Sequence, residues 1–118
     1  MPKYEGFTPA GDRVPGQLST YVATQERFRA LSSQWRQATR FLSADEDIAM
    51  HPAYQQIIGM GAKILPSILG ELAARLDHWF WALEAIAGES PVDPNDAGDL
   101  ERMRNAWLEW GHAKGLIA

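Results

Sequence analysis

The sequence predicts an all-α fold, a compact bundle of about five helices. Apolar residues recur at spacings of three and four in several segments, which places them on one face of a helix. Stretches rich in proline and glycine separate these segments. A short aromatic segment from Asp77 to Gly88 is apolar on two sides and runs only about three turns. It therefore needs neighbouring helices to be stable in water.

The composition is that of an ordinary globular domain. Hydrophobic residues make up 46% and charged residues 22% of the 118 residues, enough for one domain with a real core. The absence of cysteine excludes a disulfide framework, a thiol nucleophile and a cysteine-ligated metal. We find neither a secretory signal nor a run of about 18 apolar residues. The chain is expected to be cytoplasmic and to have no membrane partner.

The net charge of −4 is divided unevenly along the chain. Up to Leu42 there are six basic and three acidic residues, or +3, and from Ser43 onward there are five basic and twelve acidic residues, or −7. This asymmetry favours attraction between the two parts or a basic face on the folded surface.

Residues 1–17 are expected to form an extended N-terminal arm. They contain three of the seven prolines and three glycines, and they show no apolar periodicity. Tyr4 and Phe7 are the two residues that can pin such an arm to a groove. Residues 18–118 are expected to form a single α-helical domain.

The longest helix is predicted from Ser19 to about Leu42, with Ser19 or Thr20 as its N-cap. Its apolar face repeats at three and four residues and consists of Phe28, Leu31, Trp35, Ala38 and Leu42.

Three arginines of this helix, Arg29, Arg36 and Arg40, also share a face. One interpretation is a solvated stripe that pairs with acids of the later chain. The other is a footprint for nucleic acid, because arginine makes bidentate contacts to phosphate.

Three short elements follow. Residues 43–50 form an acidic turn that lacks the ligand spacing of a calcium loop. Residues 51–61 have Pro52 in the first helical turn and glycines at the end, which is typical of a short helix. Residues 62–75 carry isoleucine and leucine at helical spacing, with Pro66 in the first turn. Gly70 in the interior of that helix suggests a close approach of another helix.

The central aromatic helix has its own start and stop residues, Asp77 as N-cap and Gly88 after its last turn. Its main stripe consists of Trp79, Ala82, Leu83 and Ile86. Trp81 points to nearly the opposite side. The stripes of the preceding and following helices are expected to cover the main face.

The last helix begins after a turn-rich loop, with Asp96 or Asp99 as its cap. Gly115 is expected to end it, and the two apolar residues after Gly115 fold back on the core. The apolar stripe of this helix consists of Leu100, Met103, Trp107 and Trp110.

Parts of the chain resemble known proteins. Residues 52–88 resemble HEAT-type repeats, which implies antiparallel helix stacking and binding of proteins or nucleic acids. The segments HPAYQQIIGMG, ILPSILGEL, DHWFWALEAIAGESPV and AWLEWG resemble a family of small uncharacterised bacterial proteins. This resemblance spans residues 31–117 and implies a self-contained bacterial protein, with no activity attached.

Catalytic chemistry is not expected. The titratable candidates His51, His78 and His112 lie on different elements, and each stands where a histidine commonly only caps or packs. The sequence contains no HExxH zinc motif, no glycine-rich phosphate loop and no GxSxG nucleophile motif. We therefore expect no enzyme, no cofactor and no metal.

Tryptophan is the most informative residue type, with five in the chain. One interpretation is a tryptophan-rich core for short helices. The other is that Trp81 and Trp110 are partly exposed anchors for a partner, since tryptophan dominates binding hot spots. The leading hypothesis is a non-enzymatic protein–protein interaction module, as an adaptor, antitoxin or immunity protein, that binds a protein partner or itself. The alternative is nucleic-acid binding through Arg29, Arg36 and Arg40.

Overall fold

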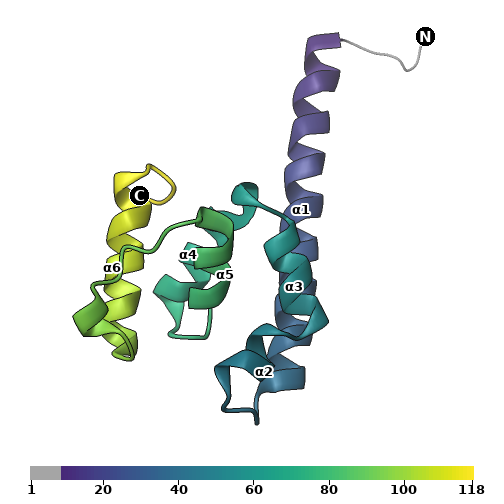
Figure 1. Cartoon of the computed structure of the whole chain (residues 1–118). Helices are drawn as coiled ribbons and strands as arrows, with labels where there is room; N and C mark the ends of the chain where they lie inside the picture. Colours follow the sequence, from purple (N-terminus) through teal and green to yellow (C-terminus); the bar gives the residue numbers. More distant parts are fainter. Residues whose placement is uncertain (1–8) are drawn as a thin grey trace.

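The structure is a computed structural model that describes the backbone of residues 9–118 (Figure 1). Its side chains are described from Thr20 onward, except that of Asp45. The described residues form helices and no strand, so the prediction of an all-α compact bundle is confirmed. In order, the elements are α1 (Pro9–Thr39), α2 (Asp45–Ala49), α3 (Pro52–Gly59), the 3-10 turn η1 (Ala62–Ile64), α4 (Leu65–Ala74), α5 (Phe80–Ala87), the 3-10 turn η2 (Pro94–Asp96) and α6 (Leu100–Ala113).

Helix α1 starts ten residues before the predicted Ser19. The prediction of an extended arm is therefore wrong for residues 9–17, while residues 1–8, with Tyr4 and Phe7, lie outside the described residues. Pro9 occupies the first turn, where its missing N–H would have no helical partner. The helix continues through Pro15 and the glycines at positions 11 and 16, although Pro15 lacks the N–H for one helical hydrogen bond.

The buried stripe of α1 differs from the predicted one at its end. Phe28, Leu31 and Trp35 are buried as expected, but the stripe continues through Thr39 and leaves Leu42 exposed. Leu42 lies beyond the end of the helix, so helical spacing no longer sets its direction. Toward its N-terminus α1 projects beyond the other helices (Figure 1), and the molecule measures 62 Å along its longest axis.

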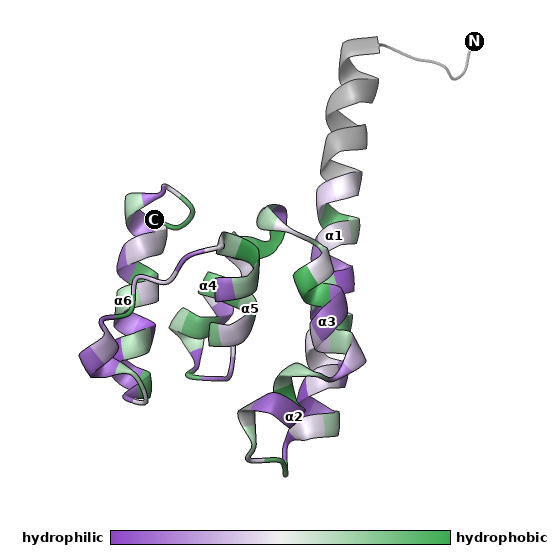
Figure 2. Cartoon of the chain, viewed as in Figure 1, coloured by the Kyte–Doolittle hydropathy of each residue, from purple (hydrophilic) through white to green (hydrophobic). Residues whose placement is uncertain are grey.

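An aromatic cluster from three helices forms the centre of the core. The Trp79 ring, beside the start of α5, lies 4.7 Å from Trp35 of α1 and 5.8 Å from Tyr54 of α3, measured between ring centroids. Phe28 lies 5.7 Å from the same indole. Large aromatic surfaces bury much apolar area per residue, which suits helices as short as these. Figure 2 shows that α3, α4 and α5 carry many hydrophobic residues.

Proline marks the first turns of α3 and α4, as predicted for Pro52 and Pro66. The chain bends by 103° between these two helices, at a break that contains Gly61. Among the described residues, no single helix has both the length and the apolar character needed to cross a bilayer, and only the bent pair of residues 52–59 and 62–74 meets that criterion jointly.

Helix α5 is capped differently from the prediction. Asp77 does not cap it, because its carboxylate accepts the backbone N–H of His78 at 2.8 Å and the helix begins three residues later. Trp79 is the N-cap residue and its side chain makes no cap bond. At the other end Gly88 adopts the left-handed conformation with φ 74°, which confirms it as the stop.

Helix α6 packs on α4, and a glycine permits the contact. A Cβ at Gly111 would lie 2.7 Å from Cδ1 of Leu69, so the glycine allows close approach. Gly70, where the sequence suggested this role, faces open space, and that prediction is wrong. Asp99 is the N-cap of α6, accepting the N–H of Arg102 at 3.2 Å.

The end of α6 confirms the predicted stop. Gly115 has φ 73°, and the N–H of Leu116 bonds to the carbonyl of Gly111 at 2.9 Å. This pattern is a Schellman turn, which reverses the chain after a helix. Leu116 and Ile117 consequently fold back onto the core.

Candidate functional site

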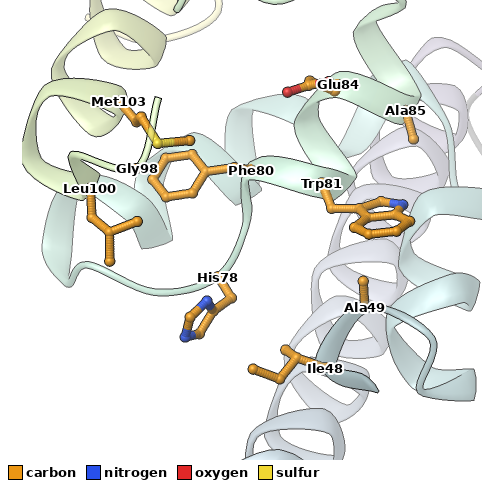
Figure 3. Close-up of a pocket in the computed structure, with 10 residues that line it drawn as sticks. All are labelled: Ile48, Ala49, His78, Phe80, Trp81, Glu84, Ala85, Gly98, Leu100 and Met103. Atoms are coloured by element: carbon orange, nitrogen blue, oxygen red, sulfur yellow. The ribbon is translucent and has the colours of Figure 1, made fainter. Parts of the chain in front are cut away.

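An apolar groove of about 590 Å³ lies between α2, α5 and the start of α6. Its volume is within the range typical of ligand-binding pockets. We call it the Trp81 groove. It is lined by Ile48, Ala49, His78, Phe80, Trp81, Glu84, Ala85, Gly98, Leu100 and Met103 (Figure 3).

Helix α5 contributes to both sides of the Trp81 groove. Figure 3 shows Phe80 pointing toward Met103 of α6, whereas Trp81 points toward Ala49 and Ile48 of α2. Successive residues of a helix point about 100° apart, so these two neighbouring aromatic residues serve different walls. Phe80 is buried, and Trp81 remains 42% exposed.

The exposure of Trp81 contrasts with that of Trp79, two residues earlier, which is 0% exposed. As the sequence predicts, Trp79 faces the core and Trp81 faces away from it. Leu100, at the far edge of the groove, is 40% exposed and does not join the core stripe predicted for α6. It is the first residue of α6 and lies beyond the part of that helix that packs inward.

The α2 wall is held by hydrogen bonds from other helices. Nε1 of Trp35 donates to the carbonyl of Ile48 at 3.0 Å, inside the core. Nε2 of Gln55 donates to the carbonyl of Ala49 at 2.8 Å. Helix α2 has only five residues and no side-chain N-cap, so its own helical bonds are too few to hold it in place. Its position depends on these two bonds and on packing.

The α5 wall is fixed by Tyr54 of α3. The Tyr54 hydroxyl donates to the carbonyl of His78 at 2.8 Å and accepts the N–H of Ala82 at 2.9 Å. That N–H belongs to the first turn of α5, where no helical carbonyl is available. A tyrosine from another helix thus replaces the missing side-chain cap and orients the turn that carries Trp81.

Exposed acidic side chains lie on α5 and α2, two of the helices that contribute to the groove lining. Glu84 lies on α5 one turn after Phe80 and is exposed, and Glu46 and Asp47 of α2 are exposed beside Ile48. Two other acids nearby are paired, Asp77 with Arg36 at 3.2 Å and Asp96 with Arg102 at 3.2 Å.

The second tryptophan anchor suggested by the sequence, Trp110, does not line the Trp81 groove. It lies late in α6, half-buried, with its ring edge-on to Trp107 at 5.1 Å. Its Nε1 donates to Glu89 at 3.0 Å, and Lys114 lies 5.9 Å from its ring. These contacts fasten the end of α6 to the loop after α5, so the two predicted anchors are not part of one surface.

The three arginines of the alternative hypothesis have different surroundings. Arg36 is partly buried and pairs with Glu71 of α4 and with Asp77. Arg29 and Arg40 are exposed, and the Arg40 guanidinium lies 4.8 Å from the ring of Phe41. Pairing with acids of the later chain, one of the two interpretations of the stripe, is thus correct for Arg36.

The three histidines lie on different elements. Nδ1 of His51 accepts the N–H of Ala53 at 3.1 Å and caps α3, His78 lines the groove, and His112 is exposed in the last turn of α6. Within the described part of the chain, no group of three or more histidine, aspartate or glutamate side chains is arranged to hold a metal ion.

Sequence reasoning identified Trp81 but missed the rest of the groove. The sequence predicts an acidic turn where Ile48 and Ala49 of α2 lie, and it places Leu100 and Met103 on the apolar stripe of the last helix. A short apolar pair within an acidic turn was the only signal that α2 has a packed side.

Comparison of this chain with protein-family models, with curated proteins and with solved structures finds no match. The resemblances to HEAT-type repeats and to small bacterial proteins therefore stay predictions.

Proposed function

We propose that this chain is a non-enzymatic protein–protein interaction module that binds its partner through the Trp81 groove. An adaptor, antitoxin or immunity role suits a domain of this size. The observation that carries the proposal is Trp81 itself, a large aromatic side chain left 42% exposed beside an apolar groove in a domain that buries Trp35, Trp79 and Trp107 completely or nearly so.

The surroundings of Trp81 fit a binding anchor. Energetically dominant residues of interfaces are enriched in tryptophan and lie at the centre of a desolvated patch. Here the indole lies next to Ala49 of α2 (Figure 3), on a helix that Tyr54 holds in place. A pre-positioned anchor loses little side-chain entropy on binding, so more of the buried area contributes to affinity.

The test compares capture of host proteins by immobilised wild type and by Trp81→Ala. If Trp81 is the anchor, its removal weakens binding by about 2–4 kcal/mol, or roughly 30- to 1000-fold. Phe41→Ala is the matched control, because Phe41 is 88% exposed and does not line the groove. Circular dichroism checks that both variants fold.

A partner that wild type and Phe41→Ala retain and that Trp81→Ala loses supports the proposal. A partner held equally by all three proteins refutes Trp81 as the anchor. Empty capture, together with a monomer in analytical ultracentrifugation, refutes the interaction module.

A further inference from the structure

The chain segments that form the Trp81 groove are strongly acidic. Residues 44–50, 77–85 and 96–103 contain eight acidic residues and one basic residue. The acids are Asp45, Glu46, Asp47, Asp77, Glu84, Asp96, Asp99 and Glu101, and the base is Arg102. These segments together carry a net charge of −7, which is more negative than the −4 of the whole chain.

Part of this charge is neutralised inside the fold. Arg36 pairs with Asp77, and Arg102 lies 3.2 Å from Asp96 and 3.5 Å from Asp99. Arg104 pairs with Glu101 at 2.7 Å.

Three exposed acids lie on α5 and α2, two of the helices that contribute to the groove lining. Among the described residues, no ion pair within 4.0 Å involves Glu84, Glu46 or Asp47. Glu84 lines the groove itself, and the other two belong to the α2 wall. The groove thus combines a mostly apolar lining with the carboxylate of Glu84, and two further exposed acids lie on α2, which contributes Ile48 and Ala49 to that lining.

We propose that the groove takes a partner segment in which large apolar side chains are flanked by lysine or arginine. This inference rests on the proposed function and specifies the chemistry of the partner. The apolar side chains would pack on Trp81, Ile48 and Met103 in place of water. The basic side chains would meet Glu84, which lines the groove, and be attracted by the exposed acids of α2.

The two components have different physical effects. Contact with the apolar floor provides most of the affinity, because it removes apolar surface from water. These exposed charges chiefly accelerate association and exclude acidic partners, and salt screens their effect. Binding is therefore expected to depend on Trp81 at every ionic strength and on the acids mainly at low salt.

The experiment measures fluorescence anisotropy of two labelled helical peptides of about four turns. Both carry leucine at spacings of three and four, and the remaining positions are lysine in one peptide and glutamate in the other. The lysine peptide is expected to bind at least about tenfold more tightly, and to weaken as NaCl rises from about 50 to about 500 mM.

Variants separate the groove from general attraction to an acidic protein. Trp81→Ala is expected to weaken the lysine peptide at least about 30-fold. Glu84→Gln is expected to weaken it about two- to fivefold at low salt. Glu109→Gln removes the same charge from an exposed position of α6 that does not line the groove, and it leaves binding unchanged.

Several results would overturn the inference. These are no binding of the lysine peptide, equal affinity for both peptides, or equal effects of Glu84→Gln and Glu109→Gln. A host partner can also depend on Trp81 for binding and yet have no basic residues in the segment that contacts the groove. That result would overturn this inference alone and leave the proposed function intact. A dimer that Trp81→Ala dissociates makes a second copy the occupant, which also overturns the inference.

Discussion

The Tyr54 hydroxyl accepts a hydrogen bond from the backbone N–H of Ala82 at 2.9 Å, across 28 positions of sequence. The same oxygen donates to the carbonyl of His78 at 2.8 Å. One phenol therefore satisfies two backbone groups that border the start of α5. Because Phe80 and Trp81 lie between those groups, the bond fixes the direction of both aromatic walls of the groove.

Tyr54→Phe is expected to destabilise the fold by about 1–3 kcal/mol, because it leaves the buried N–H of Ala82 without its partner. Urea unfolding followed by circular dichroism measures the change. Tyr21→Phe is the control, since Tyr21 is 63% exposed on α1, and it is expected to stay within about 0.5 kcal/mol of wild type. Equal stability of the two variants would show that the Tyr54 hydroxyl does not cap α5.

Glycine-to-alanine changes at Gly111 and Gly70 are expected to have opposite signs. Alanine at Gly70 meets open space and gains helix propensity, so it stabilises by about 0.5–1 kcal/mol. Alanine at Gly111 would lie 2.7 Å from Leu69, which is itself 0% exposed and cannot move without disturbing the core. Overpacking exceeds the propensity gain there, for a net loss of about 1–2 kcal/mol.

Thermal unfolding of both glycine variants checks these signs. A stable Gly111→Ala protein would mean that α4 and α6 do not approach as closely as described. A destabilised Gly70→Ala protein would mean that this face of α4 is covered.

Arg36→Gln is expected to lower stability by about 1 kcal/mol, since it breaks the partly exposed pairs with Glu71 and Asp77. The loss is expected to shrink in about 1 M NaCl, where charge interactions are screened. Arg29→Gln, at an exposed position of the same helix, serves as control in the same urea titrations. A salt-independent loss would indicate packing of the arginine stem as the cause.

The three arginines also permit a direct test of the nucleic-acid hypothesis. With Arg36 engaged in the fold, DNA and RNA are expected to keep their electrophoretic mobility in excess protein at low salt. A mobility shift that either Arg29→Ala or Arg40→Ala abolishes would revive that hypothesis.

Trp35→Phe is expected to loosen α2, because it removes the indole N–H that bonds to Ile48 at 3.0 Å. Hydrogen exchange is the appropriate measurement, since the amides of Ile48 and Met50 are bonded within α2 and its cap. Both amides should exchange faster in the variant, by more than its global loss of stability explains. Trp110→Phe changes a tryptophan late in α6 that does not line the groove, and it should leave the exchange of both α2 amides unchanged.

Much of the fold follows from local pattern. Spacings of three and four identified the buried Phe28, Leu31 and Trp35 and the core residues of α5, and glycine identified the ends of α5 and α6. The start of α1 did not follow, because residues 9–17 contain prolines and glycines of low helix propensity and show no apolar periodicity.

The candidate site was only partly predictable. The azimuth of Trp81 on α5 is a local property, so its exposure could be anticipated. The second wall depends on where α2 lies, and that position is set by Trp35 and Gln55 from distant helices. The same holds for the neighbours of Trp79, which come from α1 and α3 through contacts that no local period encodes.

The attachment of α2 has a consequence for affinity. A five-residue helix held from outside opens more readily than the rest of the core. Whenever α2 is open the groove lacks one wall, so the measured dissociation constant equals that of the closed form divided by the fraction of molecules in which α2 is closed. By the reciprocity of linkage, a bound partner would shift α2 toward its closed form by the ratio of the partner's affinities for the closed and open forms, and so protect the α2 amides from exchange. The strength of one indole hydrogen bond in the core thus enters the binding constant of the groove, because its acceptor residue, Ile48, lines that groove.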